Sequence, residues 1–488
     1  MKKAIIIGSG VAGLATSIRL ALKGYKTHVF EINPYPGGKL SAFELEGYRF
    51  DAGPSLFTMP QFVTELFDLA GEDYRVHFNY HKKKVACNYF WSDHTSFSAY
   101  SDKNNFLKEI EDTFGEPQER VDKYLKKAKK KYDLTASLFL EHSLHKLKTY
   151  LSKETLKAML QLPVFELHKT LHQANSQAFS SSKLIQLFDR YATYNGSDPY
   201  QTSGMMTLIQ HLEGTYGTFV PEGGMVSITK ALYELALRSG VTFDFQTAVD
   251  EIITEQNTTK GVCVKNSFFD ADIVVSNADV YPTYKKLLPS QKFPKKQLQQ
   301  ERSSSAVIFY WGIQHRFKEL ELHNIFFSDD YKEEFNAIFN KQTVSDDPTI
   351  YVNITSKDIP GDAPEGCENW FVMINTPADR GQDWEVIVNQ LRTFILFKLS
   401  NKLGVDLAPL IVCESLLTPP LIESKTQSHL GALYGSSSND SMAAFLRHPN
   451  FSNHLKNLYF CGGSVHPGGG IPLCLLSAKI VDELIPEA

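Results

Sequence analysis

The alternation of apolar and polar residues predicts a strand, a helix and a second strand at the start of the chain. Residues 4–7 (Ala-Ile-Ile-Ile) form a short apolar run that is typical of a buried parallel strand. Apolar residues then recur at helical spacing, with Leu14 and Ile18 on one face. Residues 27–30 (Thr-His-Val-Phe) form the second strand, which ends at Glu31. This order predicts a βαβ unit.

The same pattern predicts further elements along the chain. From about residue 106 to residue 187 the spacing is helical, with few glycines or prolines. Amphipathic helices are also expected at 226–238 and 473–485. Strands are expected in the apolar runs 240–243, 248–252, 273–279, 306–312, 350–354, 370–374 and 458–461. Because strands and helices alternate at both ends of the chain, an α/β fold is expected.

Glycines after the first strand predict a site for the phosphates of a dinucleotide. Gly8 permits a tight turn, Gly10 lets a pyrophosphate approach the backbone, and Gly13 lets the helix pack closely on the strand. The N–H groups and the positive dipole at the start of the helix favour a phosphate. Glu31 stands about twenty residues further on, where it can accept hydrogen bonds from a ribose diol.

Two more glycine-rich segments indicate that the dinucleotide is a long one. Residues 37–39 (Gly-Gly-Lys) closely follow Glu31 and supply a second glycine pair with a cation. Such a pair suits a cofactor whose pyrophosphate is held from two sides. Residues 462–472 (Gly-Gly-Ser-Val-His-Pro-Gly-Gly-Gly-Ile-Pro) precede the C-terminal helix and form a concavity of backbone N–H groups. The N-terminus of that helix would stabilise negative charge on a ligand.

Composition and charge restrict the classes of protein. The chain has 488 residues, 42% hydrophobic and 22% charged, which is typical of a globular protein with two or three domains. A net charge of −5 argues against a nucleic-acid partner. The six cysteines form no CxxC pair or cluster, so no metal site or disulfide framework is expected. The apolar run after Lys3 is too short for a signal peptide, and no stretch reaches the eighteen apolar residues of a transmembrane helix. We therefore expect a cytoplasmic protein.

The glycine-rich segments resemble those of flavin proteins in the amine-oxidase and phytoene-desaturase superfamily. In that superfamily a Gly-Gly-Arg element follows the ribose acid, and Lys39 stands at the arginine position here. A lysine keeps the charge but loses the bidentate fork, so its phosphate contact is expected to be looser or indirect. The segment 459–472 resembles the C-terminal motif of bacterial phytoene-desaturase-type enzymes, roughly VGxxTHPGxGIP. Many amine oxidases have an acidic residue in this turn that holds the ribityl chain of the flavin. The segment here has no such residue, so we expect backbone groups to hold the ribityl chain.

The resemblance implies a Rossmann-like FAD-binding domain with a mixed-sheet substrate domain and a helical cap, as in the amine-oxidase and GDI superfamily. The implied boundaries are 1–72, 219–282 and 450–488 for the FAD-binding domain, 73–112 and 283–449 for the substrate-binding domain, and 113–218 for the cap. Val249 is implied to bind adenine through its backbone. The implied FAD-contacting residues are Gly8, Ser9, Gly10, Val11, Ala12, Gly13, Glu31, Ile32, Gly37, Gly38, Lys39, Leu40, Gly53, Pro54, Ser55, Val249, Gly462, Gly463, Gly470, Ile471 and Pro472.

Two segments connect the chain to carotenoid chemistry. Residues 188–199 (FDRYATYNGSDP) resemble the bacterial carotenoid desaturases, and residues 51–59 (DAGPSLFTM) resemble the branch that acts on 1-hydroxycarotenoids at C3–C4. The resemblance implies an FAD-dependent desaturase that passes a hydride from a hydrophobic carotenoid to flavin N5 and loses a proton from the neighbouring carbon. FAD is expected to be the only redox cofactor, reoxidised by a quinone or oxygen.

Other functions stay open. A phytoene desaturase of the same family, a carotene isomerase, or another flavoenzyme such as an amine or porphyrinogen oxidase would carry similar motifs. An NAD-dependent dehydrogenase would leave the glycine turn at 462–472 without a role. The Rab GDP-dissociation inhibitors share the fold and bind prenylated partners without flavin, but they lack a complete flavin turn of this kind.

Three residues are candidates for a role in catalysis. Asp189 and Arg190 are adjacent charges in an aromatic segment, which could guide a carotenoid end group, assist proton loss or form a structural salt bridge. His466 lies in the C-terminal glycine turn, where it could touch the isoalloxazine edge or serve the hydrogen bonding of the turn itself.

The expected helical cap begins with crowded lysines and continues with apolar residues. The lysines are Lys123, Lys126, Lys127, Lys129, Lys130 and Lys131. The apolar residues are Leu134, Leu138, Phe139, Leu140, Leu144, Leu147, Tyr150, Leu151, Leu156, Met159 and Leu160. Such a segment could dock on anionic lipid, or it could be a solvated face on ordinary core helices. Because a carotenoid is dissolved in the membrane, we expect peripheral membrane association through this cap.

Overall fold

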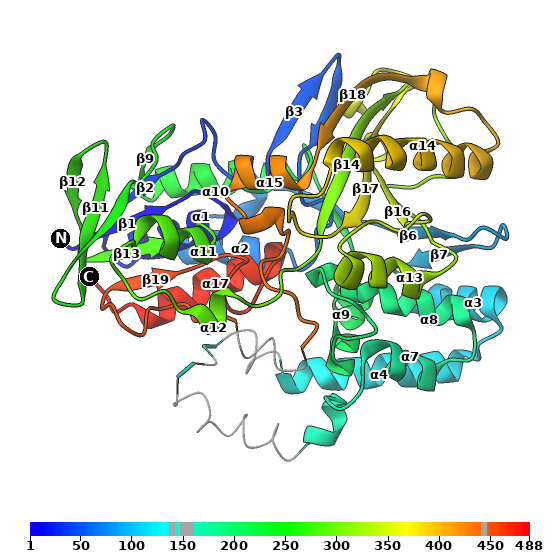
Figure 1. Cartoon of the computed structure of the whole chain (residues 1–488), viewed down its shortest axis with the longest axis horizontal. Coiled ribbons are helices and arrows are strands. Elements are labelled where there is room, and N and C mark those ends of the chain that lie inside the picture. The colour runs from blue at the N-terminus through cyan, green and yellow to red at the C-terminus, as the bar shows by residue number, and fades with distance from the viewer. Residues whose placement is uncertain (136–141, 144, 147–160, 441–446) are drawn as a thin grey trace.

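The structure is a computed structural model that describes residues 1–135, 142–143, 145–146, 161–440 and 447–488. A five-stranded sheet lies at the end of the molecule where both chain termini are found, and a seven-stranded sheet lies at the other end (Figure 1). Helices from residues 103–211 lie below the second sheet in this view. This arrangement confirms the expected α/β fold with a second, mixed sheet and a group of helices.

The five-stranded sheet is parallel throughout and takes strands from distant parts of the chain. Its order is β19-β13-β1-β2-β9. The bounds are β1 (Lys3–Ile7), β2 (Lys26–Phe30), β9 (Thr242–Asp244), β13 (Ile273–Ser276) and β19 (Leu458–Phe460). Each strand lies within or close to an apolar run in which a strand was expected. The sheet therefore brings the start, the middle and the end of the chain together.

Alternate side chains of β1 enter two different cores, as strand geometry requires. Ala4 and Ile6 pack against four helices, which are α1 (Val11–Leu22), α2 (Gln61–Ala70), α10 (Val226–Arg238) and α17 (Ile471–Leu484). Ile5 and Ile7 pack towards a three-stranded antiparallel sheet of β10 (Glu251–Glu255), β11 (Thr258–Val264) and β12 (Ser267–Asp270). The parallel sheet is thus the middle of three layers.

The strand expected at 248–252 begins later than the sequence suggested. Its counterpart β10 starts at Glu251, so Val249 lies in the preceding loop. The N–H groups of Gln246 and Thr247 donate to the carbonyl oxygens of Asn33 and Glu31, at 3.1 and 2.8 Å. These bonds tie the residues before Val249 to the loop after β2 and not to β11.

The seven-stranded sheet has the order β18-β14-β17-β16-β15-β6-β7, and every neighbouring pair is antiparallel except β15 and β6. The bounds are β6 (Val85–Phe90), β7 (Ser96–Tyr100), β14 (Ser305–Ile313), β15 (His323–Phe326), β16 (Ile350–Ile354), β17 (Glu368–Thr376) and β18 (Ile411–Leu417). The strands expected at 306–312, 350–354 and 370–374 are therefore confirmed as β14, β16 and β17.

Helix α14 (Trp384–Leu403) covers the outer face of the seven-stranded sheet (Figure 1). Leu391, Ile395 and Leu399 of this helix pack against strand residues such as Trp311 and Trp370, which are fully buried. The side chains that alternate with these strand residues point to the opposite, inner face, which lines a cavity.

The helices of residues 103–211 pack against the edge of this sheet around Tyr89, Phe97 and Phe188. They are α3 (Lys103–Phe114), α4 (Gln118–Thr135), α7 (Leu171–Ala178), α8 (Ser182–Asp189) and α9 (Leu208–His211). The lysine-rich segment forms α4, whose lysines are exposed except for Lys131, which is fully buried and bonded to Glu166. Of the apolar residues expected to follow, Leu134 is partly buried. The others, from Leu138 to Leu160, lie outside the described residues.

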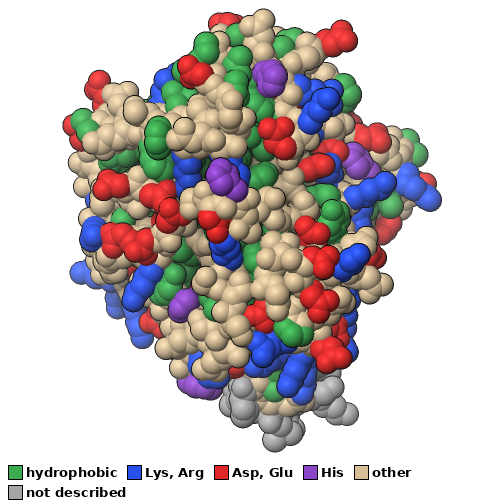
Figure 2. Space-filling view, turned by 90° about the vertical axis from the view of Figure 1, so that its right-hand side faces the viewer, with side chains coloured by type: hydrophobic (Ala, Val, Ile, Leu, Met, Phe, Trp, Pro, Cys, Tyr) green, Lys and Arg blue, Asp and Glu red, His purple; other side chains and the backbone are tan. Residues whose placement is uncertain are grey.

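Short elements connect these parts. They are β3 (Ala42–Leu45), β4 (Tyr48–Asp51), β5 (Tyr80–Lys82), β8 (Phe219–Pro221), α11 (Val280–Pro282), α12 (Lys295–Leu298), α13 (Tyr331–Asn336) and α15 (Pro419–Thr426). On the face shown in Figure 2, acidic and basic side chains are interspersed. Among the helices that the structure describes, none combines the length and apolar character needed to span a bilayer.

The packing of α14 on the sheet gives a stability prediction. Replacing the fully buried Ile395 by alanine removes side-chain contacts with the sheet and leaves a cavity. The free energy of unfolding should fall by about 2–5 kcal/mol. Phe397 on the same helix is 66% exposed, so Phe397→Ala should change the free energy by less than about 0.5 kcal/mol. Urea denaturation followed by circular dichroism measures both, and equal losses would contradict the assigned packing.

Candidate functional site

A cavity of about 1120 Å³ extends from the carboxyl edge of the parallel sheet to the inner face of the seven-stranded sheet. Most of the residues expected at a cofactor or substrate site line it: Gly8, Gly10, Val11, Ala12, Glu31, Ile32, Gly37, Gly38, Lys39, Leu40, Gly53, Pro54, Ser55, Arg190, Val249, Gly462, Gly463, His466, Gly470, Ile471 and Pro472. Ser9, Gly13 and Asp189 lie outside the lining. The carboxyl edge of a parallel sheet is where open α/β proteins bind ligands.

The first glycine turn is held by close backbone contacts. Gly8 has φ of +94°, a value that favours glycine, and an added Cβ at Gly13 would lie 2.2 Å from the Gly8 carbonyl oxygen. Gly13 therefore allows the close helix–strand packing that the sequence predicted. No side chain among the described residues caps the start of α1 at Gly10, and Gly10, Val11 and Ala12 line the cavity, so the first N–H groups are available to a ligand there.

Gly10 is constrained by a protein side chain. A Cβ at this position would lie 2.7 Å from Oδ1 of Asn277. Asn277 directly follows β13 and donates from Nδ2 to the Cys461 carbonyl, at 3.2 Å, so it links the two glycine turns. Asn277 thus gives a second reason for a glycine at position 10, and the expected approach of a pyrophosphate stays a prediction.

Glu31 ends β2 and organises the turn beside it. One carboxylate oxygen accepts from the N–H and the hydroxyl of Ser9, each at 2.7 Å. The other accepts from the backbone and side-chain nitrogens of Asn33, at 2.9 and 3.0 Å. The residue is 4% exposed and lines the cavity. These four bonds occupy the roughly four lone-pair sites that a carboxylate offers, so a ribose hydroxyl would have to displace one of the present donors to bond here.

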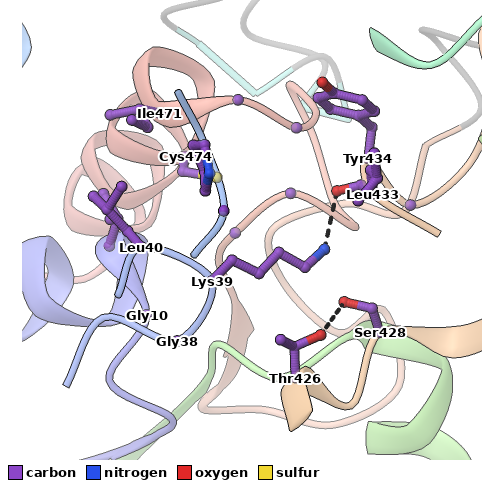
Figure 3. A pocket seen from close by; sticks show the side chains of 18 of the residues that line it. Gly10, Gly38, Lys39, Leu40, Thr426, Ser428, Leu433, Tyr434, Ile471 and Cys474 are labelled. Atoms are coloured by element: carbon purple, nitrogen blue, oxygen red, sulfur yellow. Dashed lines mark hydrogen bonds between the residues drawn. The ribbon is translucent and has the colours of Figure 1, made fainter. Parts of the chain in front are cut away.

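The second glycine pair is joined to the first turn. The N–H of Gly37 donates to the Ser9 carbonyl at 2.8 Å. The ammonium of Lys39 donates to the Leu433 carbonyl at 3.0 Å (Figure 3). It also donates to the Ala432 carbonyl at 3.3 Å. Burial lowers the pKa of Lys39, and the nearby Asp279 opposes that shift. The cation is therefore engaged by backbone oxygens of the chain, and the looser or indirect phosphate contact expected for Lys39 stays a prediction.

The C-terminal glycine turn leads into α17, whose first residues are Ile471 and Pro472. No side chain among the described residues caps this helix at Gly470, and its first residues line the cavity. Gly462 has φ of +109°, and an added Cβ would lie 2.7 Å from the Asn277 amide nitrogen. Helix α17 packs on α1, so two helix N-termini line the same cavity. Together they provide a polar cradle for an anionic, two-ended ligand.

His466 is 1% exposed and lines the cavity beside this turn. Its Nε2 nitrogen donates to the His142 carbonyl at 3.1 Å, and burial lowers its pKa to about 3. The imidazole is therefore neutral, with Nδ1 as an unprotonated acceptor. This bond joins the turn to a segment distant in sequence, and both expected roles of His466 stay predictions.

The structure separates Asp189 from Arg190. The Asp189 carboxylate contacts Nδ1 of His172 at 2.6 Å and accepts from Asn175 at 2.8 Å, outside the cavity lining. Arg190 lines the cavity and donates to the hydroxyls of Tyr89 and Tyr194, at 2.6 and 3.1 Å. Asp189 is therefore a buried structural acid, and the two neighbours do not form a pair that acts on one ligand.

The remaining cavity wall is largely apolar. Ile308, Ile325, Phe371 and Met373 of the inner sheet face lie on one side, and methionines and leucines of residues 205–212 lie on another. Glu213 also lines this part and accepts from the hydroxyl of Tyr191 at 3.0 Å. Asn277 lies within the strand expected at 273–279, and the sequence analysis identified neither Asn277 nor Glu213 as a site residue.

Similar proteins of known activity match the chain along its whole length. A 1-hydroxycarotenoid 3,4-desaturase of Flavobacterium sp. (strain P99-3) is 57% identical over 487 residues, covering 100% of this chain and 99% of that protein. A phytoene desaturase of Fusarium fujikuroi is 31% identical over 510 residues, covering 99% of this chain and 89% of that protein.

Solved structures share the fold at low identity. A putrescine oxidase bound to putrescine has a TM-score of 0.63 and 12% identity, covering 99% of this chain and 97% of that one. A Rab GDI from Plasmodium falciparum has a TM-score of 0.55 and 12% identity, covering 100% and 99%. The amine-oxidase and GDI fold expected from the sequence is therefore confirmed.

The family model described as "Flavin containing amine oxidoreductase" matches residues 11–481, which is nearly the entire chain. The glycine cradle, the two uncapped helix N-termini and the acid at the end of β2 fit a flavin dinucleotide. The chain therefore belongs to the flavin-containing amine oxidoreductase family, and its cofactor is FAD.

Proposed function

We propose that this flavoenzyme is a carotenoid desaturase that introduces the C3–C4 double bond of a 1-hydroxycarotenoid. The observation that carries this proposal is full-length similarity, at 57% identity, to a protein with that activity. The cavity supports it, because one continuous space joins the glycine turns to a long apolar wall. An apolar wall of this kind suits a hydrocarbon chain, which would otherwise be exposed to water.

The residues of the cavity divide between cofactor and substrate in this proposal. The turns at residues 8–13, 37–40, 53–55 and 462–472 hold FAD, Glu31 accepts from the ribose, and Val249 lies near the adenine. Bound flavin supplies the acceptor for a hydride. The N-termini of α1 and α17 stabilise negative charge, because their N–H groups and dipoles are fixed before the ligand arrives. The apolar sheet face orients the substrate and excludes water.

The boundaries of the parts follow the same proposal. We assign 1–72, 219–282 and 450–488 to FAD binding, 73–112 and 283–449 to substrate binding, and 113–218 to the cap. All five strands of the parallel sheet lie within the first set. All seven strands of the other sheet lie within the second set. We further propose that a quinone or oxygen reoxidises the flavin directly.

A single-turnover experiment tests the reaction. Enzyme with oxidised FAD is mixed anaerobically with a 1-hydroxycarotenoid, without nicotinamide, and product is followed by chromatography. The flavin absorbance should bleach in step with formation of the 3,4-desaturated product. Phytoene is the matched substrate for the alternative activity of the more distant relatives. If phytoene is converted faster than the 1-hydroxycarotenoid, phytoene is the substrate and the proposed one is wrong. A requirement for NAD or NADP would contradict direct transfer of the hydride to flavin.

The contact between Gly10 and Asn277 gives a prediction for cofactor binding. Gly10→Ala places a methyl carbon 2.7 Å from Asn277 Oδ1 and should weaken FAD binding by about tenfold. Adding Asn277→Ala removes the clash, so the double variant should regain most of its flavin, and Asn277→Ala alone is the control. The ratio of flavin to protein absorbance after dialysis measures retention. A double variant without flavin would show that the cofactor itself needs the space above Gly10.

We also propose that the enzyme reaches its substrate by docking on the membrane through the lysines of α4. Lys126, Lys127 and Lys129 are 73%, 48% and 57% exposed, although each is within 2.8 Å of a carboxylate. Lys130 is exposed on the same helix. Anionic lipid attracts such residues when they lie near the surface.

Glutamine replacements test this membrane contact. Replacing Lys126, Lys127, Lys129 and Lys130 should weaken binding to phosphatidylserine vesicles, by roughly 1 kcal/mol per lysine near the surface. The control replaces the exposed lysines 260, 265, 318 and 332, which changes the net charge equally. Co-sedimentation measures both variants. If both variants sediment alike, α4 has no special role and its lysines are an ordinary solvated face.

A further inference from the structure

The side chain of Lys39 runs across the cavity from the second glycine pair. Its backbone follows Gly38, where an added Cβ would lie 3.7 Å from the Cα of Gly10, so the lysine starts beside the first glycine turn. Its ammonium lies at the other end, where it donates to the carbonyls of Ala432 and Leu433. Figure 3 shows the side chain extended from the glycine pair towards Leu433. Lys39 is partly exposed and lines the cavity, so it is open to a ligand there.

Among the residues that the structure describes, no carboxylate forms an ion pair with the Lys39 ammonium. Asp279 is the acid whose charge acts on Lys39, but its carboxylate lies 3.8 Å from the guanidinium of Arg302 and accepts from the N–H of Tyr281 at 2.9 Å. An ammonium has three N–H donors, and two carbonyls leave one of them over. A cation shielded from water normally has an anionic partner, because its desolvation is costly. Lys39 therefore indicates an anionic group on the ligand of this cavity.

The ammonium lies close to the start of α17. Tyr434, which follows the Leu433 carbonyl, packs on the C-terminal glycine turn, because an added Cβ at Gly469 would lie 2.9 Å from the Cα of Tyr434. Cys474 lies in the first turn of α17 and in the same pocket as Lys39 (Figure 3). Burial raises the pKa of the Cys474 thiol to about 11, and the nearby charge of Lys39 opposes that shift. The ammonium and the uncapped N-terminus of α17 thus place positive charge at one part of the cavity.

We propose that Lys39 pairs with the negative charge that the isoalloxazine ring gains on reduction, and so raises the reduction potential of bound FAD. This inference rests on the placement of FAD proposed above. A hydride brings two electrons and one proton to the ring, so the ring gains one negative charge. A cation that is fixed beside this charge stabilises the reduced form more than the oxidised form. Lys39 thereby makes the flavin a stronger hydride acceptor, which suits a substrate whose hydrogens are bonded to carbon.

The direction of the side chain favours the ring over the pyrophosphate as the partner of Lys39. The pyrophosphate is proposed to lie at the first glycine turn, which is where the lysine starts. The ammonium is bonded at the far end, and an extended lysine places it roughly 6 Å from its own Cα. The five-carbon ribityl chain, which separates the pyrophosphate of FAD from the ring, spans a similar length. The two partners also differ in effect, because the charge of the pyrophosphate is the same in both redox states.

The midpoint potential of bound FAD tests the inference without any carotenoid. Holoenzyme is reduced anaerobically in the presence of reference dyes, and both absorbances are followed. In Lys39→Met the affinity for reduced flavin should fall about tenfold more than that for oxidised flavin, which lowers the potential of this two-electron couple by about 30 mV. Lys39→Arg keeps the charge and should retain most of the wild-type potential. Lys332→Met changes the net charge equally at an exposed site on α13, and it should leave the potential unchanged.

Lys39→Gln separates the charge of the ammonium from its bonds to the chain. It keeps an N–H donor for the Leu433 carbonyl, so its potential should fall as in Lys39→Met, while thermal unfolding and flavin content monitor folding. An unchanged potential in both neutral variants would overturn the inference. Complete loss of oxidised FAD from both would also overturn it, because Lys39 would then serve the pyrophosphate. If the potential falls as expected but wild type desaturates no carotenoid, the proposed reaction fails and the role of Lys39 stands.

Discussion

The contact between α1 and the first glycine turn sets the geometry on which the cofactor side of the molecule depends. An added Cβ at Gly13 would lie 2.2 Å from the Gly8 carbonyl, so no side chain can separate the helix from the end of β1. The first residues of α1, Val11 and Ala12, line the cavity, and no side chain among the described residues caps this end of the helix. Ser9 in the same turn bonds both to Glu31 and to Gly37. One short turn thus determines where three polar elements of the cavity lie.

Strand geometry constrains the seven-stranded sheet, because alternate residues of each strand point to opposite faces. On β15, Phe326 enters the core beneath α14, while His323 and Ile325 line the cavity. A shift of one residue in strand pairing would exchange these environments and bury the histidine in the wrong core. The same strand pairing therefore secures both the packing of α14 and the chemistry of the cavity wall.

Local patterns made much of the fold predictable. β1, β2 and α10 follow apolar spacing that a short segment contains by itself, and α10 begins and ends where expected. The glycine turns were predictable because Gly8, Gly37 and Gly462 have positive φ, and because Gly10 and Gly13 leave no room for a Cβ. Val249 was assigned to a strand that begins later, because bonds from Gln246 and Thr247 to distant residues fix the preceding loop.

The polar residues of the cavity were harder to predict because their roles depend on neighbours distant in sequence. Asp189 and Arg190 are adjacent, yet one bonds to α7 and the other faces the cavity. The two side chains point to different places because α8 ends at Asp189 and a 3-10 helix begins at Arg190. The spacing of apolar residues does not predict this change of helix type. His323 depends on Tyr351, 28 residues later, and on a strand pairing that sequence alone does not reveal.

The order in which the ribosome makes these parts has a consequence for how the holoenzyme forms. Helices α1 and α17 pack together, although about 450 residues separate the end of one from the start of the other. At translation rates of roughly 5–20 residues per second, that interval takes about 20–90 s. During that time the apolar face of α1 lacks its contact with α17, and the part of the cavity wall formed by residues 462–472 has not been made. In the proposed FAD site, residues 462–472 can take part only after α17 has been made, so cofactor loading would follow synthesis of that helix.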